Sequence, residues 1–184
     1  MNEDVYAKLS KVAYEKDAPE VYEGYRLDKE LSDGKRKTFV HEQTGDVVVA
    51  NAGTQLKNPR QRMKDIGSDL AIAFGAEKYD PRFRESERHQ RRVEHKYGGK
   101  GITQVGHSLG GSVANYLGKK SDSVKKVVTY NAGGGLFSDR GSGKSVNYYT
   151  QGDVLSNVRA LVNRGTNIVT RGKRKNAHTI MNFV

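Results

Sequence analysis

The chain has 184 residues, carries a formal net charge of +11 at pH 7 and has no cysteine. The absence of cysteine excludes disulfides, thiol catalysis and thiolate metal sites, and the length predicts one domain over residues 1–184 with a single core. The excess of lysine and arginine favours anionic partners such as nucleic acid, phospholipid headgroups or acidic substrates.

The basic residues are concentrated in three stretches, 57–64, 82–100 and 164–175. Such runs most often form a well-solvated surface. The longest apolar run, residues 70–76, is far shorter than the roughly 20 residues that cross a bilayer. The polar start MNEDVYAKLS lacks the apolar centre of a signal peptide. We therefore expect a soluble protein, cytoplasmic by default, although a virus-encoded or released protein would have the same features.

The first half of the chain predicts a helix, then strands, then two further helices. Apolar residues recur at helical spacing in residues 2–14. Strand patterns follow over 22–31, 35–42 and 46–54, separated by polar turns. The contiguous valines 47–49 predict a strand buried on both faces. Helical patterns follow over 59–74 and 81–97, and the second, mostly charged helix is expected on the outside of the molecule.

The second half of the chain predicts a parallel sheet. A short strand over 102–105, a turn, a helix over 109–119 and a strand over 124–130 form a βαβ unit. Further strands are expected over 145–149 and 168–173, followed by a short closing segment. The fold class is therefore α/β, with a mostly parallel central sheet flanked by helices.

The turn after the strand at 102–105 contains the sequence Gly-His-Ser-Leu-Gly, with the serine at position 108. In an open α/β sheet, residues at the carboxyl ends of strands face the crevice where ligands bind. A strand that turns sharply into a helix strains the residue at the turn, and small neighbours such as Gly106, Gly110 and Gly111 allow the strand and helix to approach. This pattern is typical of a nucleophile elbow, and Ser108 is the predicted nucleophile.

A serine nucleophile needs a histidine base, which in turn needs a carboxylate to orient it. In this type of elbow, the acid and then the histidine follow the serine along the chain. His178 is the only histidine that follows Ser108. The other histidines precede Ser108 or lie in the elbow itself: His41, His89, His95 and His107.

Three aspartates lie between Ser108 and His178 and are candidates for the acid. Asp122 follows the far end of the helix that leaves the elbow, and Asp139 lies in a glycine-rich loop. Asp153 directly follows a strand pattern and a glycine, so it should project from the same edge of the sheet as the serine. The predicted triad is Ser108, Asp153 and His178, and the predicted chemistry is acyl transfer without a metal or organic cofactor.

Six segments in this order resemble motifs of the class 3, fungal-type lipases of the α/β-hydrolase fold. They are VVVANAGT (47–54), MKDIGSDLAIAFG (63–75), VGHSLGGSVANYL (105–117), VTYNAGGG (128–135), TQGDVLSNV (150–158) and NAHTIMNFV (176–184). The resemblance implies an esterase, lipase or phospholipase acting on a lipid or ester. It also implies that the backbone N–H groups of Thr54 and Leu109 form the oxyanion hole.

The sequence departs from the family pattern in places. Asn51 and Ala52 replace a Phe-Arg pair, which leaves the support of the oxyanion loop open, and Ile66 replaces a tryptophan. Residues 55–69, where the family has a lid, are polar and basic rather than apolar. Such a flap fits short esters or peripheral contact with an anionic membrane surface better than oil droplets.

Two alternative functions are open at this point. SDRGSGKS (138–145) nearly matches a phosphate-binding loop, which would fit a nucleotide or nucleic-acid partner, but Ser138 replaces the first glycine and a strand-like pattern follows instead of a helix. Nucleic acid is therefore the less favoured partner. The second alternative is a non-catalytic binding module with a hydrolase-like fold, and the intact order of the triad argues against it.

Overall fold

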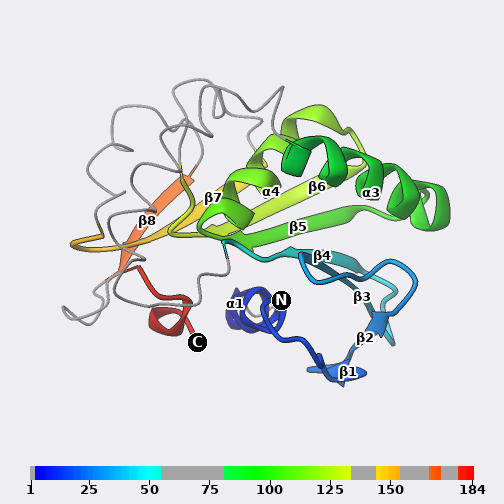
Figure 1. Cartoon of the computed structure of the whole chain (residues 1–184), viewed down its shortest axis with the longest axis horizontal. Helices are drawn as coiled ribbons and strands as arrows, with labels where there is room; N and C mark the ends of the chain where they lie inside the picture. Colours follow the sequence, from blue (N-terminus) through cyan, green and yellow to red (C-terminus); the bar gives the residue numbers. More distant parts are fainter. Residues whose placement is uncertain (1–2, 55–80, 134–143, 154–165, 171–177) are drawn as a thin grey trace.

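The computed structural model describes residues 3–54, 81–133, 144–153, 166–170 and 178–184 (Figure 1). The predicted helix over 59–74 and the region where a lid was expected lie outside the described residues, as does the glycine-rich segment 134–143. The single-domain organisation of the whole chain remains a prediction.

Eight strands of the described residues form one sheet in which spatial order follows sequence order. The first four strands pair antiparallel, and the pairs from the fourth to the eighth are parallel. The α/β fold with a mostly parallel sheet is therefore confirmed. The strands are β1 (Val21–Tyr22), β2 (Tyr25–Asp28), β3 (Arg36–His41), β4 (Val47–Asn51), β5 (Ile102–His107), β6 (Val124–Tyr130), β7 (Ser145–Thr150) and β8 (Thr166–Thr170).

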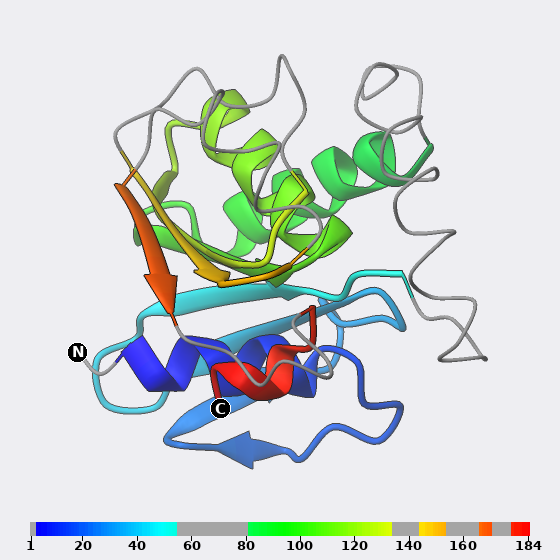
Figure 2. The same cartoon turned by 90° about the vertical axis from the view of Figure 1, so that its left-hand side faces the viewer.

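Helices cover both faces of this sheet (Figures 1 and 2). The helices α3 (Pro81–Tyr97) and α4 (Leu109–Lys120) lie on one face. The helix α1 (Glu3–Val12) and the short 3₁₀ helix η1 (Ile180–Asn182) lie side by side on the other. The first and last segments of the chain therefore meet below the parallel strands.

The parallel half of the sheet holds most of the core. All of β4 is buried, with Val47 and Val49 fully inaccessible and Val48 1% exposed, as expected for a strand covered on both faces. On the face of α1, Leu9 and Phe39 are also fully buried. On the opposite face, Phe83 and Val93 of α3 are buried while its many charged residues lie outside, as predicted.

The N-terminal strands differ from the sequence prediction in one respect. Residues 22–31 were expected to form one extended stretch, but the chain reverses after Tyr22 and forms the hairpin β1–β2. Glu23 and Gly24 make the turn with φ angles of 51° and 80°. Positive φ at both central residues matches the twist of a two-residue hairpin, and the glutamate hides this signal in the sequence because it is not a usual turn residue.

The parallel strands end at one edge, which brings distant segments together. β5 ends at His107, directly before Ser108, and is paired with β6, which in turn pairs with β7. The backbone N–H of Asp153 donates to Thr150 O (3.1 Å), which folds the chain back at the end of β7. The edge that the sequence predicted as the site of chemistry therefore carries both a serine and an aspartate.

Candidate active site

Ser108 occupies a strained turn between β5 and α4. Its φ of 56° and ψ of −128° are far from the conformations that a serine normally adopts. Such a backbone costs on the order of 1–3 kcal/mol and persists only where surrounding contacts enforce it. The strain holds the serine at the tip of the strand, as a nucleophile elbow requires.

The glycines on both sides of Ser108 are required by close backbone approach. A Cβ atom on Gly106 would lie 2.3 Å from Gly110 O, and a Cβ atom on Gly110 would lie 2.1 Å from Asn51 O. Both distances are far below van der Waals contact, and both partners are backbone atoms that cannot rotate away. The elbow can therefore form only with glycine at these positions, since β5, α4 and the end of β4 touch through their backbones.

The structure brings the three predicted side chains within hydrogen-bonding distance. His178 Nε2 lies 2.9 Å from Ser108 Oγ, and His178 Nδ1 lies 3.0 Å from Asp153 Oδ1. A carboxylate only accepts hydrogen bonds, so the Nδ1–H of His178 donates to Asp153. In the neutral imidazole, Nε2 is then free of hydrogen and accepts the hydroxyl proton of Ser108.

The three side chains of this arrangement are largely buried. The side chain of Asp153 is 1% exposed and that of His178 is 13% exposed, while Ser108 is 5% exposed. A buried carboxylate is costly unless it is paired, and His178 supplies a donor. If His178 takes the proton of Ser108, the imidazolium faces a carboxylate at 3.0 Å in a poorly solvated site.

Gly53 brings the end of β4 directly against Ser108. A Cβ atom on Gly53 would lie 2.8 Å from His107 O and 3.2 Å from Ser108 Cβ, so no side chain fits there. Thr54 follows as an exposed residue at the edge of the described segment. Leu109 is the first residue of α4, where backbone N–H groups have no acceptor within the helix. Both predicted oxyanion residues are thus sequence neighbours of Ser108 or of the glycine that touches it.

Tyr14 and His107, to which no sequence pattern assigned a role, contact these groups. The Tyr14 hydroxyl accepts the Gly53 N–H at 2.8 Å and lies 2.9 Å from His107 Nδ1. His107 Nε2 lies 2.7 Å from the backbone oxygen of His178. His107 was excluded as the base in the sequence analysis, and in the structure its two ring nitrogens contact Tyr14 and the backbone of His178. No local pattern could reveal these contacts, since they join residues 39 to 93 positions apart.

Within the described ranges, no group of three or more histidine, aspartate or glutamate side chains is arranged to hold a metal ion. In the same residues, no helix combines the length and apolar character needed to cross a membrane.

The fold and the arrangement at the elbow are those of an α/β-hydrolase-like protein. A solved structure with a similar fold is that of the Lip2 lipase from Yarrowia lipolytica, with a TM-score of 0.62. The match covers 90% of this chain and 77% of that chain at 14% sequence identity, so it shows a lipase-like fold. No protein-family model matches the sequence. No curated protein matches it either.

Proposed function

We propose that this protein is a serine hydrolase that cleaves carboxylic ester bonds of lipids, in the manner of the class 3 lipases whose motifs its sequence resembles. The observation that carries this proposal is the connected set of hydrogen bonds from Ser108 Oγ through His178 to Asp153, at 2.9 and 3.0 Å. The strained backbone of Ser108 and the lipase-like fold support the same conclusion.

The reaction proceeds in two acyl-transfer steps. Ser108 Oγ attacks the ester carbonyl while His178 Nε2 takes the hydroxyl proton, and Asp153 stabilises the imidazolium that forms. The oxyanion of the tetrahedral intermediate accepts hydrogen bonds from the N–H groups of Thr54 and Leu109, each worth about 3 kcal/mol. His178 then protonates the leaving alcohol, and water repeats the cycle on the acyl-enzyme, which releases the acid and restores Ser108.

The phosphate-loop alternative lacks its structural requirement. Such a loop runs from a strand into a helix, whereas Ser145 begins the strand β7. Residues 138–143 of that segment lie outside the described residues. Nucleotide binding is therefore not proposed, and peripheral contact with an anionic membrane surface remains a prediction.

The proposal is tested with a series of p-nitrophenyl esters of increasing chain length and a fluorophosphonate probe. Wild-type protein should hydrolyse the esters and be labelled once per chain, and Ser108→Ala should abolish both. Ser10→Ala is a matched control, because Ser10 is buried on α1 and its hydroxyl has no hydrogen-bond partner among the described residues. A wild-type protein that neither reacts with the probe nor hydrolyses any ester would show a non-catalytic module instead.

A further inference from the structure

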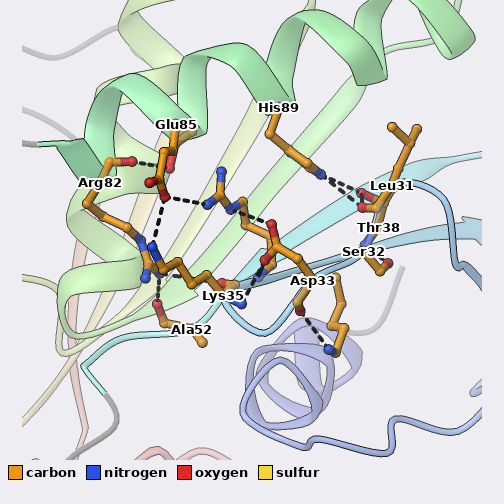
Figure 3. Close-up of polar contacts among 12 residues, drawn as sticks. Leu31, Ser32, Asp33, Lys35, Thr38, Ala52, Arg82, Glu85 and His89 are labelled. Carbon is orange, nitrogen blue, oxygen red and sulfur yellow. Dashed lines mark hydrogen bonds and ion pairs between the residues drawn. The ribbon is translucent and has the colours of Figure 1, made fainter.

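The peptide group between Ala52 and Gly53 is held at both ends by side chains from other parts of the chain. Its N–H donates to the hydroxyl of Tyr14, which follows α1, at 2.8 Å. Its carbonyl oxygen accepts a hydrogen bond from Arg82 Nη2, which reaches it from the first turn of α3 (Figure 3). One peptide group thus has a partner for its donor, just after α1, and a partner for its acceptor, on α3, and these two helices lie on opposite faces of the sheet.

The position of Arg82 near the start of α3 is electrostatically unfavourable for a cation. It lies in the first turn of α3, where the positive end of the helix dipole disfavours a cation and where there is no acidic residue. Burial lowers the pKa of Arg82, and the nearby Arg36 lowers it further. Its Nη2 also lies 3.4 Å from Lys35 O, next to the ion pair of Glu85 with Lys35 (Figure 3). Glu85 also pairs with Arg36. The hydrogen bonds of Arg82 to two backbone carbonyl oxygens offset part of the cost of this unfavourable position.

Tyr14 connects the same peptide group to the histidine of the site. The backbone oxygen of His178 only accepts, so His107 Nε2 carries the hydrogen of the 2.7 Å contact. In neutral His107, Nδ1 is then an acceptor, and the Tyr14 hydroxyl donates to it at 2.9 Å. The hydroxyl oxygen is left to accept the Gly53 N–H. All three hydrogen bonds therefore run in one direction, from Gly53 towards His178.

We propose that Arg82 and Tyr14 are positioning residues that clamp the Ala52–Gly53 peptide and thereby fix the direction of the Thr54 N–H in the oxyanion hole. This inference rests on the proposed hydrolase function. Ala52 stands where the motif that this stretch resembles has an arginine, and Arg82 supplies a guanidinium to the same loop from a separate helix.

The clamp matters because an oxyanion donor works only at the correct position. The N–H must point at the place where the negative charge develops, at about 2.7–3.1 Å from the oxygen. Gly53 has no side chain of its own that could fix the loop, and Thr54 is exposed. Rotation of the Ala52–Gly53 peptide would change the direction of the following N–H, and a displacement of about 1 Å is enough to cost about 100-fold in rate.

The test compares Arg82→Ala, Arg82→Lys, Tyr14→Phe and the double variant Arg82→Ala/Tyr14→Phe on p-nitrophenyl butyrate. Each single removal should lower kcat about 10–100-fold with KM within about twofold, and lysine should restore part of the loss. The affinity for a trifluoromethyl ketone, which forms an oxyanion adduct with Ser108, should weaken by a similar factor. Because both side chains hold one peptide group, kcat of the double variant should be at most about threefold lower than kcat of the slower single variant.

Two control variants remove comparable groups elsewhere. Arg26→Ala removes an exposed arginine that pairs with Glu42 on the N-terminal strands, and Tyr22→Phe removes the hydroxyl of a partly buried tyrosine. Both should retain wild-type kcat. Thermal midpoints of all variants separate positioning from a general loss of stability, since a destabilised but correctly formed site keeps its kcat at a temperature where the protein is folded.

Several outcomes would overturn the inference. The inference would be overturned by an unchanged kcat in both single variants or by multiplicative losses of kcat in the double variant. It would also be overturned if KM for the ester rose by the same factor as the affinity for the ketone fell. Each result would show that the two residues do not act through this peptide. A shifted pH profile of kcat/KM would show that they act on His178 instead. These outcomes leave the proposed function intact, whereas a wild-type protein inert to ester and probe removes both proposals.

Discussion

Replacing Gly53 by alanine tests how closely the end of β4 approaches Ser108. The added Cβ atom would lie 2.5 Å from the Tyr14 hydroxyl oxygen, 2.8 Å from His107 O and 3.2 Å from Ser108 Cβ. Tyr14 could move, but only by giving up its hydrogen bond to the Gly53 N–H. His107 O belongs to the backbone of β5, so the loop rather than the strand has to shift.

The magnitude follows from these contacts. Forcing one methyl group into a packed site costs about 1–3 kcal/mol of stability. A loop that moves away from Ser108 also carries the Thr54 N–H with it, and in the proposed mechanism the loss of this oxyanion donor lowers kcat about 10²–10³-fold. We therefore expect Gly53→Ala to remain folded with a lower free energy of unfolding and to lose most of its activity.

The assay is kcat and KM on p-nitrophenyl butyrate, together with urea unfolding. Gly34→Ala is the matched control, because a Cβ atom there would meet no heavy atom within 4 Å and should change stability by less than about 0.5 kcal/mol. A folded Gly53→Ala protein with wild-type kcat would refute the reasoning, since it would mean that this loop tolerates displacement without loss of the oxyanion site.

Two further predictions concern ionisable groups. Asp153→Asn should lower kcat about 10⁴-fold in the same assay, because the amide can donate to Nδ1 and then holds His178 in the wrong tautomer, and a rate within tenfold of wild type would contradict this. Burial lowers the pKa of His89 below its ordinary value of 6.5, so the folded state disfavours the protonated ring. The corresponding stability is present above pH 6.5 and is lost as the pH falls from there through the folded pKa. Urea unfolding between pH 5 and 7 should therefore show a steeper loss for wild type than for His89→Gln, and equal slopes would exclude this contribution.

The sequence determined most of the described elements from local patterns, and the candidate triad from the order of its residues along the chain. Periodicity and turn residues identified α3 and β6 with the bounds that the structure has, because the apolar residues of α3 fall on one side and the apolar run of β6 is bounded by polar residues. The order of serine, aspartate and histidine selected Ser108, Asp153 and His178, and the structure brings these side chains together. Parallel strands end at one edge of a sheet, so strand-end residues can be predicted to meet.

Only the tertiary structure decided which side chains support the candidate site. Tyr14 follows α1 and Arg82 belongs to α3, the two helices cover opposite faces of the sheet, and both side chains contact one peptide group through hydrogen bonds that span 39 and 30 residues. Periodicity reports which face of an element is buried, but it does not report the partner of a polar side chain. That choice depends on how α1 and α3 pack against the end of β4, and hydrogen-bonding distances of about 3 Å are fixed only when the packing is complete.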